Sequence, residues 1–533
     1  MSYDLVVKNA RIVDGTGSPW FRGDIGVKDG KISYVGKLPE DVYADEIIDA
    51  GGQVLSPGFI DSHAHSDFVL FRDPTMLSKL KQGVTTQMIG PCGISPAPIK
   101  PERVELLDKY VGFIKAGAEP KYNWQTFGEY LNVLDELDLG TNIGSYVGHG
   151  TVKLNVMGFD ARKPTEEELK EMRRQVRDAM ADGAFGMTTG LIYPPGVYSE
   201  PEEIVEVAKA LKEFNGVYLS HMRSEGNNVV QAVKETINVA EKVGIPAQVH
   251  HHKACGKKNR GIVKETIKLL EEARQRGVDM TIDQYPYTAG SSTLRAIIPP
   301  WVQEGGIEKV IERLQDQALR ARIIDEINNT DDWENLIHLT DGPEGVLIVY
   351  TPSTPEYQGK TLVRIGEMMG KDPIEAALDI IIANKGFDNA CYFILDEDDV
   401  KYVMKSPLTM IGSDSIFAAP GAKCHPRTNG TFPRVLGKYV REEKTLTLEE
   451  AVKKMTGFPA SRFNMRHKGL IRVGMDADLV IFDPDTIIDR ADFEDPFKDP
   501  VGINYVIVNG NLTLKNGQFT GKTSGKVIRR GQN

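Results

Sequence analysis

Two histidines separated by one residue are the first indication of chemistry in this chain. His63 and His65 stand in the stretch SPGFIDSHAHSD, directly after the apolar run VLSPGFI. On a strand, side chains two residues apart point to the same side, so both imidazoles are expected to face one site where the strand ends. Two neutral imidazoles make up half of a typical zinc site. A polar loop with two histidines and no metal is the alternative interpretation of this pair taken alone.

A cysteine follows a second apolar run. Cys92 closes the stretch TTQMIGPCG, between a proline and a glycine, so a sharp turn is expected to hold its sulfur at the end of a strand. A thiolate is an excellent zinc ligand. A lone cysteine is otherwise a small buried hydrophobic residue, and a catalytic nucleophile is the third option, although no local motif supports it.

Two more groups of histidines end apolar runs. His221 closes VYLSH, and His250, His251 and His252 close PAQVHHH one strand–helix unit later. Side chains at the carboxyl ends of successive parallel strands meet at the same face of a barrel, which is where such barrels carry their active sites. At most one or two residues of the triplet need bind a metal, and the others are expected to support the ligands or to pack.

An aspartate follows the last apolar run of this kind. Asp414 stands in MIGSDS. A carboxylate beside a metal-bound water can remove a proton from it as a general base and later return that proton to a leaving nitrogen as a general acid. Ser-Asp-Ser is also common in turns, so a turn cap is the alternative role for this residue.

The pattern of elements suits a barrel that would bring these residues together. Residues 61–466 alternate helices with short apolar strands, which favours a (β/α)8 TIM-like barrel over an open doubly wound sheet. Thr165 and Glu168 form a capping box before Leu169, Met172 and Val176, which recur on one face of a predicted helix.

Both ends of the chain differ from this middle part. Residues 1–60 and 467–533 read as short alternating strands with Asp-Gly and Gly-Gly turns. They predict one small β domain, a sandwich or barrel built from both termini. Residues 285–348 do not fit a regular strand–helix unit, and we expect them to form a lid-like insertion.

Charge and composition limit the partners. The 533 residues carry a formal net charge of -11 and no apolar run that approaches the ~20 residues of a membrane span. Nucleic acid and anionic membranes are polyanions and are therefore excluded as main partners, which leaves a small molecule. Four cysteines in so long a chain and the lack of a secretory signal favour the cytoplasm. The sequence leaves open whether the chain forms a homo-oligomer.

Beyond these patterns, the chain resembles the metal-dependent amidohydrolase superfamily, and within it the N-acyl-D-amino-acid deacylase (D-aminoacylase) family. The resemblance runs through almost the whole chain, in PGFIDSHAHSD, GPCG, YLSHMRSE, HHHKACGKKN, DQYPYTAGSS, IGSDS, HPRTNGTFPRVLGKYV and GMDADLVIFD. The HxH and GxDADLV motifs are shared by the superfamily, whereas Cys92 and the DQYPYTAGSS and GTFPRVLGKYV stretches are narrower.

The resemblance implies a metal site. One tight zinc would be held by Cys92, His221 and His251, and a second, looser position by His63, His65 and the bridging Cys92. The family usually has Ser-His-x-Lys where this chain has His250-His251-His252-Lys253, so His250 and His252 remain alternative ligands.

The resemblance also implies a reaction. It gives Asp414 the general acid and base role, and it places at the substrate Lys253, Tyr193, Tyr285 and Ser291. The expected reaction is zinc-dependent hydrolysis of N-acyl-D-amino acids to a carboxylate and a free D-amino acid. A D-residue dipeptidase and a cyclic-amide hydrolase such as a hydantoinase or dihydroorotase are the alternatives, and a non-catalytic barrel is the weaker one. The stretches GTNIGSYVGHG and GAFGMTTG carry no lysine for the bridge that cyclic-amide hydrolases use, which favours the deacylase.

Overall fold

A barrel of parallel strands forms the centre of the molecule. The computed structural model describes residues 2–532. Adjacent barrel strands pair in parallel, with β9 and β10 forming one interrupted strand. The eight strand positions are β6 (Phe59–Asp61), β8 (Val84–Ile89), β9 (Asn142–Ser145) with β10 (Val147–Gly148), β11 (Gly186–Gly190), β12 (Val217–His221), β13 (Ala247–Val249), β14 (Met280–Gln284) and β19 (Thr409–Ile411). The structure thus confirms the predicted (β/α)8 fold.

The segments that follow the first barrel strand, β6, and the last one, β19, pair with each other. β7 (Ala64–His65) pairs in parallel with β20 (Ser415–Ile416). Below this pair, the fully buried Lys79 ammonium donates to Asp61 Oδ2 at 2.8 Å and to Ser415 Oγ at 2.7 Å. A buried charge is tolerated when it is paired and hydrogen-bonded in this way, and here it links β6 to β20.

Helices, most of them amphipathic, cover the barrel. In α5 (Glu166–Asp182) the predicted capping box is present, since Thr165 accepts from the Glu168 amide and Glu168 accepts from the Thr165 amide. Its Met172, Val176 and Met180 are buried, as the helical spacing predicts. Other helices of this layer are α3 (Phe127–Asp135), α4 (His149–Met157), α6 (Pro201–Ala208), α7 (Val229–Val243), α8 (Val263–Gln275), α14 (Glu397–Lys405) and α16 (Leu448–Met455).

Strands from both chain ends form one separate sheet. Its nine strands run in the order β24-β23-β22-β21-β5-β1-β2-β3, with β4 paired to β1. The N-terminal members are β1 (Ser2–Ile12), β2 (Phe21–Lys28), β3 (Lys31–Gly36), β4 (Tyr43–Asp49) and β5 (Val54–Pro57), and the C-terminal ones are β21 (Leu479–Phe482), β22 (Ile503–Val508), β23 (Asn511–Lys515) and β24 (Gln518–Phe519). β5 and β21 pair antiparallel at the junction, which confirms a β domain made by both termini.

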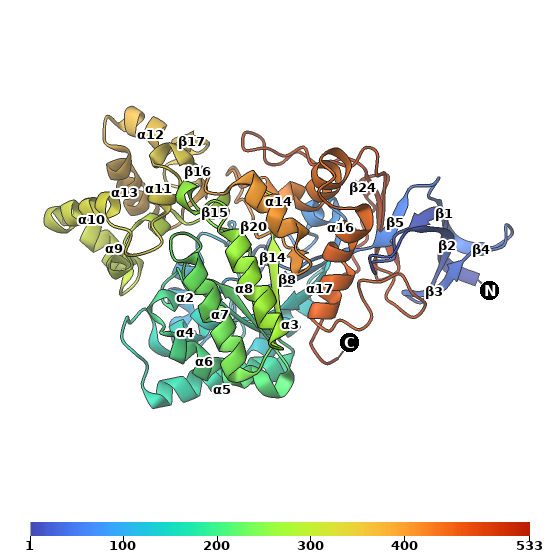
Figure 1. Cartoon of the computed structure of the whole chain (residues 1–533), viewed down its shortest axis with the longest axis horizontal. Helices are drawn as coiled ribbons and strands as arrows, with labels where there is room; N and C mark the ends of the chain where they lie inside the picture. Colours follow the sequence, from blue (N-terminus) through green and yellow to red (C-terminus); the bar gives the residue numbers. More distant parts are fainter. Residues whose placement is uncertain (1, 533) are drawn as a thin grey trace.

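A second small sheet lies in an insertion between barrel strands β14 and β19. Its order is β15-β18-β16-β17, with β15 (Gly290–Ser292), β16 (Val346–Tyr350), β17 (Lys360–Thr361) and β18 (Asn389–Tyr392). Helices α9 (Ile307–Gln315), α10 (Gln317–Asn329), α11 (Leu336–Leu339), α12 (Leu362–Met369) and α13 (Pro373–Asn384) enclose a hydrophobic core of their own. Figure 1 shows this insertion and the strands β1 to β4 at opposite ends of the molecule.

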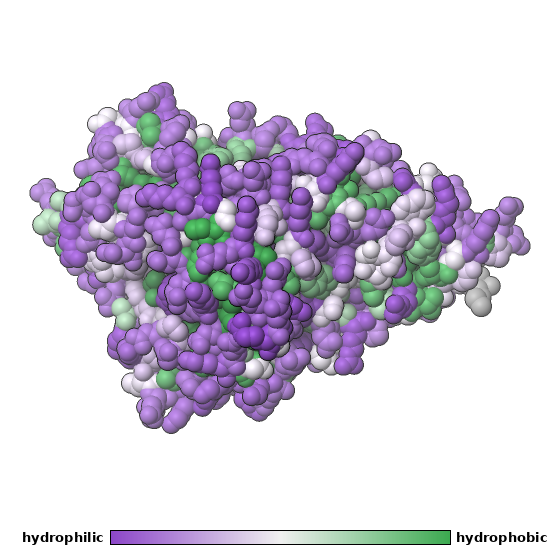
Figure 2. Space-filling model, viewed as in Figure 1, coloured by the Kyte–Doolittle hydropathy of each residue, from purple (hydrophilic) through white to green (hydrophobic). Residues whose placement is uncertain are grey.

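One face of the molecule is mostly polar. The face seen in Figure 2 is largely hydrophilic, with small apolar areas between charged side chains. Among residues 2–532, no helix combines the length and the apolar character that a membrane crossing requires.

Candidate active site

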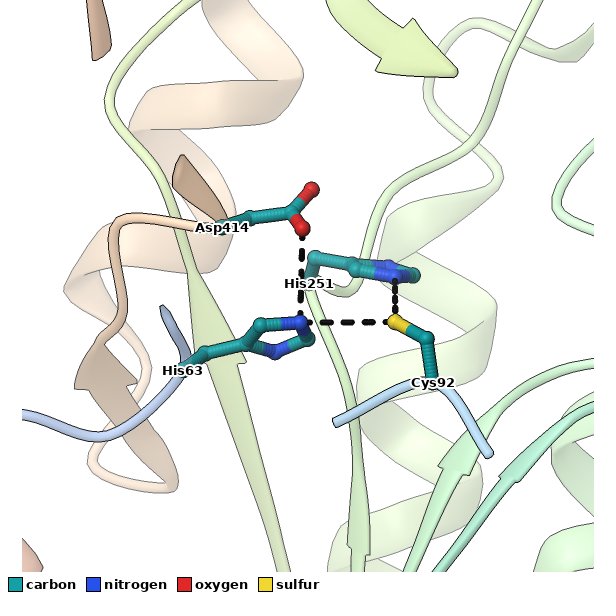
Figure 3. A group of neighbouring side chains, drawn as sticks. All are labelled: His63, Cys92, His251 and Asp414. Carbon is teal, nitrogen blue, oxygen red and sulfur yellow. Dashed lines mark hydrogen bonds and ion pairs between the residues drawn. The ribbon is translucent and has the colours of Figure 1, made fainter. Parts of the chain in front are cut away.

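The candidate catalytic and metal-binding residues lie close together at the carboxyl ends of the barrel strands. Cys92 follows β8, His251 follows β13 and Asp414 follows β19, and all three are buried. Cys92 Sγ lies 3.4 Å from His251 Nε2 and 3.4 Å from His63 Nε2 (Figure 3). His63, Cys92, His251 and Asp414 each present one atom that can bind a metal, and these four atoms lie within 4.8 Å of one another.

The remaining histidines extend this cluster on two sides. His221, the last residue of β12, places Nδ1 2.9 Å from His251 Nε2. On the other side, His63 Nε2 and His65 Nε2 each lie 3.3 Å from Asp414 Oδ1. The cluster therefore has two halves that share Cys92, one with His221 and His251 and one with His63 and His65.

The protonation of these groups suits a bound cation. Burial lowers the pKa of His221 and of His251 well below the usual value, so both imidazoles are neutral, which is the form that binds metals. Burial raises the pKa of the Cys92 thiol to about 11, so a thiolate here requires a nearby cation. Cys92 Sγ and His221 Nδ1 both lie close to His251 Nε2, and a sulfur and imidazole nitrogens are the donor types that zinc prefers.

The three consecutive histidines point in different directions. His251 faces Cys92 and His221. His250 lies below the cluster, with Nε2 3.9 Å from Asp283 Oδ2, and His252 Nε2 lies 2.8 Å from Thr266 Oγ1 on α8. Of the three, His251 is the one whose ring nitrogen approaches the cysteine.

A buried aspartate contacts both halves of the cluster. Asp283, in strand β14, places Oδ1 3.2 Å from His63 Nδ1 and accepts from the His251 backbone amide at 2.7 Å. Its other oxygen accepts from the Gln248 side-chain amide at 2.5 Å. Although burial works against it, Asp283 helps to raise the pKa of His63, and its hold on Nδ1 leaves Nε2 facing Cys92, where a bound metal would replace the proton.

A buried glutamate has the same relation to His251. Glu225 Oε1 lies 2.8 Å from His251 Nδ1 and 2.6 Å from Lys253 Nζ. Burial disfavours the charged form of Lys253, but the Glu225 carboxylate raises the pKa of Lys253 above its usual value. The lysine is therefore an ammonium, which can only donate hydrogen bonds. Lys253 then donates to Glu225 and to the His251 carbonyl, while His251 Nδ1–H donates to Glu225. Lys253 Nζ also lies 2.8 Å from His251 Nδ1, so Nε2 is the free lone pair when Nδ1–H donates to Glu225.

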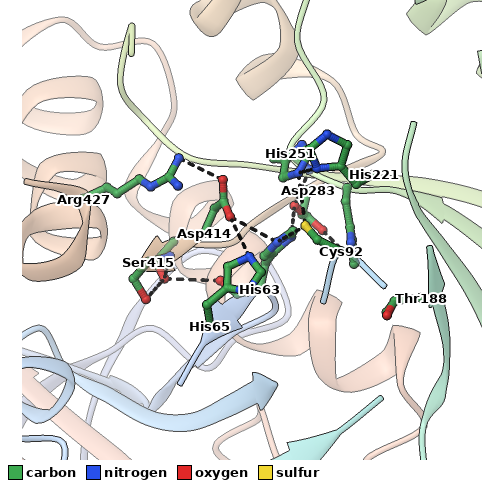
Figure 4. A network of polar contacts seen from close by, with 12 residues as sticks. His63, His65, Cys92, Thr188, His221, His251, Asp283, Asp414, Ser415 and Arg427 are labelled. Carbon is green, nitrogen blue, oxygen red and sulfur yellow. Dashed lines mark hydrogen bonds and ion pairs between the residues drawn. The ribbon is translucent and has the colours of Figure 1, made fainter. Parts of the chain in front are cut away.

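An arginine controls the charge of Asp414. Arg427, at the start of α15 (Arg427–Arg434), is fully buried and places Nη1 2.8 Å from Asp414 Oδ2. Burial works against ionisation of this carboxyl, but the Arg427 charge, together with the hydrogen bond from His63, holds its pKa well below the usual value. Arg427 also lies over the Tyr285 ring, 4.5 Å from its centre. Asp414 is therefore a carboxylate whose Oδ1 faces the histidines (Figure 4).

Three residues of the cluster have unusual backbone angles. The φ angles are +53° at Cys92, +33° at His251 and +47° at Asp414. Non-glycine residues seldom adopt positive φ, which costs on the order of 1–3 kcal/mol where the surrounding structure must impose it. These backbone conformations turn each side chain from its strand end towards the same point.

The four residues expected at the substrate all line the pocket beside this cluster. Tyr285 Oη has no hydrogen-bond partner, and Lys253 Nζ lies 5.5 Å from the centre of the Tyr285 ring. Tyr193 Oη lies 2.9 Å from Ser292 Oγ, and Ser291 Oγ donates to Asn389 at 2.6 Å. Apolar side chains complete the lining, namely Ile94, Phe113, Ile192, Leu336, Tyr392, Ile394 and Ile416.

Sequence analysis did not single out Asp283, Glu225 or Arg427. Asp283 had a usable signal, because it lies inside an apolar strand that ends in the DQYPY stretch. Glu225 and Arg427 stand beyond strand ends, four residues after His221 and thirteen after Asp414, where no spacing rule applies.

Comparison with known proteins identifies the family of this chain. A model of the amidohydrolase family matches residues 46–514. A D-aminoacylase from Alcaligenes xylosoxydans xylosoxydans is 36% identical over 99% of this chain and 98% of its own.

Two solved structures are similar over the whole chain. The N-acyl-D-glutamate deacylase of Bordetella bronchiseptica, complexed with zinc and a phosphonate inhibitor that mimics the reaction's tetrahedral intermediate, has a TM-score of 0.84 at 32% identity and covers 99% of this chain and 100% of its own. A D-aminoacylase with a binuclear metal center has a TM-score of 0.83 at 36% identity, with the same coverage. The chain belongs to the amidohydrolase family.

Proposed function

We propose that this protein is a zinc-dependent hydrolase that cleaves the amide bond of N-acyl-D-amino acids. The observation that carries the proposal is the cluster of His63, Cys92, His251 and Asp414 at one end of the barrel, with His221 beside His251 and a pocket that contains Lys253. The names of the relatives described above, D-aminoacylase and N-acyl-D-glutamate deacylase, state this activity. Both relatives align with almost the whole chain.

One tight zinc would be held by Cys92, His221 and His251, and a second, looser metal by His63, His65 and the shared Cys92. The two halves of the cluster support this division. In one half, the ring nitrogens of His221 and His251 lie 2.9 Å apart. In the other, His63 lies beside the Cys92 sulfur, and both His63 and His65 lie beside the Asp414 carboxylate. When bound, zinc lowers the pKa of water towards neutrality and polarises a carbonyl oxygen.

Asp414 carries the proton through the reaction. Arg427 keeps the carboxylate ionised and holds Oδ2, so Oδ1 is available to accept a proton from the attacking water. As water adds to the acyl carbonyl carbon and the carbon–nitrogen bond breaks, the same oxygen returns the proton to the departing amine. The products are a carboxylate and a free amino acid.

Lys253, Tyr285, Tyr193 and Ser291 position the substrate. The Lys253 ammonium and the unpartnered Tyr285 hydroxyl lie on the same side of the pocket and suit the α-carboxylate of an amino acid. Tyr193 lies beside His221, with ring centres 5.1 Å apart, where its hydroxyl can donate to the acyl oxygen.

The proposed function includes an assignment of the chain to two domains and a lid. We assign residues 1–60 and 467–533 to the small β domain, 61–466 to the catalytic barrel and about 285–348 to a lid. The lid assignment is supported by the insertion residues that line the catalytic pocket, among them Ser291 and Leu336. Closing such a lid over the substrate would exclude water from the reaction.

The direct test is hydrolysis of paired N-acetyl-D- and N-acetyl-L-amino acids by the purified protein, together with its zinc content. We expect about one tightly held zinc per chain and release of amino acid from the D-substrate at least about tenfold faster than from the L-substrate. Cleavage of dipeptides or cyclic amides with neither acetyl substrate attacked would move the proposal to the other amidohydrolase activities. Protein without any bound metal would refute it.

Glu225 offers a test of how the tight site is oriented. In Glu225→Gln the side chain keeps its size but no longer accepts strongly from His251 Nδ1–H, so the His251 tautomer is no longer fixed. Loss of such a supporting carboxylate typically weakens metal binding about 10- to 100-fold. We expect a zinc dissociation constant raised by that factor and activity that returns at high zinc concentration.

The matched control is Glu203→Gln. Glu203 is also a buried glutamate paired with a buried lysine, Lys153 at 2.8 Å, but it lies outside the metal cluster. Its zinc affinity should equal that of the parent. Equal zinc affinity in the Glu225 variant would show that Glu225 has no part in holding His251.

A further inference from the structure

A larger cavity lies next to the catalytic pocket. It has a volume of about 390 Å³, against about 40 Å³ of free space in the catalytic pocket itself. Its walls come from the start of α7, the loop after β12, and the insertion. The neighbouring cavity therefore offers much more free space than the catalytic pocket alone.

The two spaces share one wall. Ile192 lines both of them. Next to it, Glu334 of the insertion holds the loop after β12, where it accepts from Ser224 Oγ and from the Glu225 amide at 2.7 Å each. Ser224 and Glu334 face the larger cavity, and Glu225 faces the catalytic pocket. The catalytic pocket and the larger cavity are thus separated by the Ile192 side chain and by the contact of Glu334 with the loop after β12.

The orientation of the reaction directs the acyl group towards this wall. Figure 4 shows Asp414 and Arg427 on one side of Cys92, and His221 and Thr188 on the other. Asp414 must reach the leaving nitrogen, so the amino-acid part of the substrate lies on the Asp414 side. The acyl part then points to the side of β11, which Ile192 follows by two residues.

The larger cavity suits an aliphatic chain. The wall area that a guest would meet is mainly apolar, with Val197, Ala232, Ala296, Ile298 and Trp333 among its residues. Two acids and an arginine of its wall are already engaged within the protein, since Arg223 forms an ion pair with Glu235 at 2.9 Å and Glu334 accepts from Ser224 and the Glu225 amide. A hydrocarbon chain gains by leaving water for such a surface, and it requires no new polar partner.

We propose that this cavity is an acyl-chain subsite and that the enzyme prefers substrates with a medium-length alkyl acyl group, such as octanoyl, over acetyl. The proposal rests on the deacylase function proposed above. The chain enters past Ile192 while the amide stays beside Cys92 and Asp414.

The test compares kcat/KM for N-octanoyl- and N-acetyl-D-leucine. In the parent we expect the octanoyl substrate to be favoured at least about tenfold, because several additional methylene groups are buried. Ala296→Phe, on the 3-10 helix Leu294–Ile297, fills the cavity, so the octanoyl-to-acetyl ratio should fall at least about tenfold. Octanoate should raise the melting temperature of the parent more than acetate does, and this difference should vanish in Ala296→Phe.

Ala383→Phe is the matched control. Ala383 is an exposed residue of α13 in the same insertion and lies away from the cavity, so the ratio should be that of the parent. A parent that favours acetyl, or a ratio that Ala296→Phe leaves unchanged, overturns the subsite. If the parent cleaves neither N-octanoyl- nor N-acetyl-leucine, whether in the D or the L form, the proposed deacylase function fails instead.

Discussion

The Asp414→Asn variant is expected to lose about 10³- to 10⁴-fold in kcat while it keeps its tightly bound zinc. Asparagine has the same shape but can neither accept a proton from water nor return one to the departing amine. The tight-site donors Cys92, His221 and His251 do not include this side chain, so metal content should stay at the parent value. Steady-state kinetics and metal analysis on the same samples provide the measurement.

A control is needed because the substitution leaves Arg427 without its counter-charge. Asp489 is likewise a buried carboxylate beside an arginine, 3.0 Å from Arg434, and it does not line the catalytic pocket. Asp489→Asn should therefore report the cost of breaking such a pair, as a lower melting temperature with activity within a few-fold of the parent. Asp414→Asn activity within tenfold of the parent would remove this residue from the proton transfer.

The residues at strand ends could be predicted because barrel geometry makes a local pattern meaningful in three dimensions. His221, Cys92 and Asp414 each follow an apolar run, and parallel strands direct such positions to one face. The helix at α5 was equally clear, because its capping box and its apolar spacing agree.

The contacts that tune these residues could not be predicted in the same way. Arg427 reaches Asp414 only because the chain turns back after β20 into α15, and no residue pattern shows that path. Likewise, the insertion pairs β15 with β18, nearly one hundred residues later, around a hydrophobic core of its own. Pairings so distant in sequence depend on the packing of the whole unit and are not visible in local periodicity.

The choice among His250, His251 and His252 shows the limit most plainly. Adjacent side chains of an extended segment alternate in direction, so periodicity alone would group the first and third. The positive φ at His251 breaks this alternation and turns its ring towards Cys92. A single backbone conformation, imposed by the surrounding structure, thus decides which imidazole joins the cluster.

The second large effect is expected from Cys92→Ala, which removes the sulfur shared by both halves of the cluster. We expect zinc affinity to fall by more than the roughly 100-fold typical of losing a supporting residue, and hydrolysis to be lost with the metal. Zinc titration of chelator-treated protein, followed by the rise in melting temperature, measures this directly. Cys255→Ala, a buried cysteine outside the cluster, should bind zinc like the parent.

The same variant tests whether the thiolate is the ligand. Because burial raises the pKa of Cys92 to about 11, binding of zinc at pH 6.5–8 must displace the thiol proton. Affinity should therefore rise about tenfold per pH unit in the parent, as protons become scarcer. His221 and His251 are already neutral in this range, so they add no such dependence. In Cys92→Ala the slope should vanish, and a slope that survives the substitution would mean that another group supplies the proton and that the sulfur is not a metal ligand.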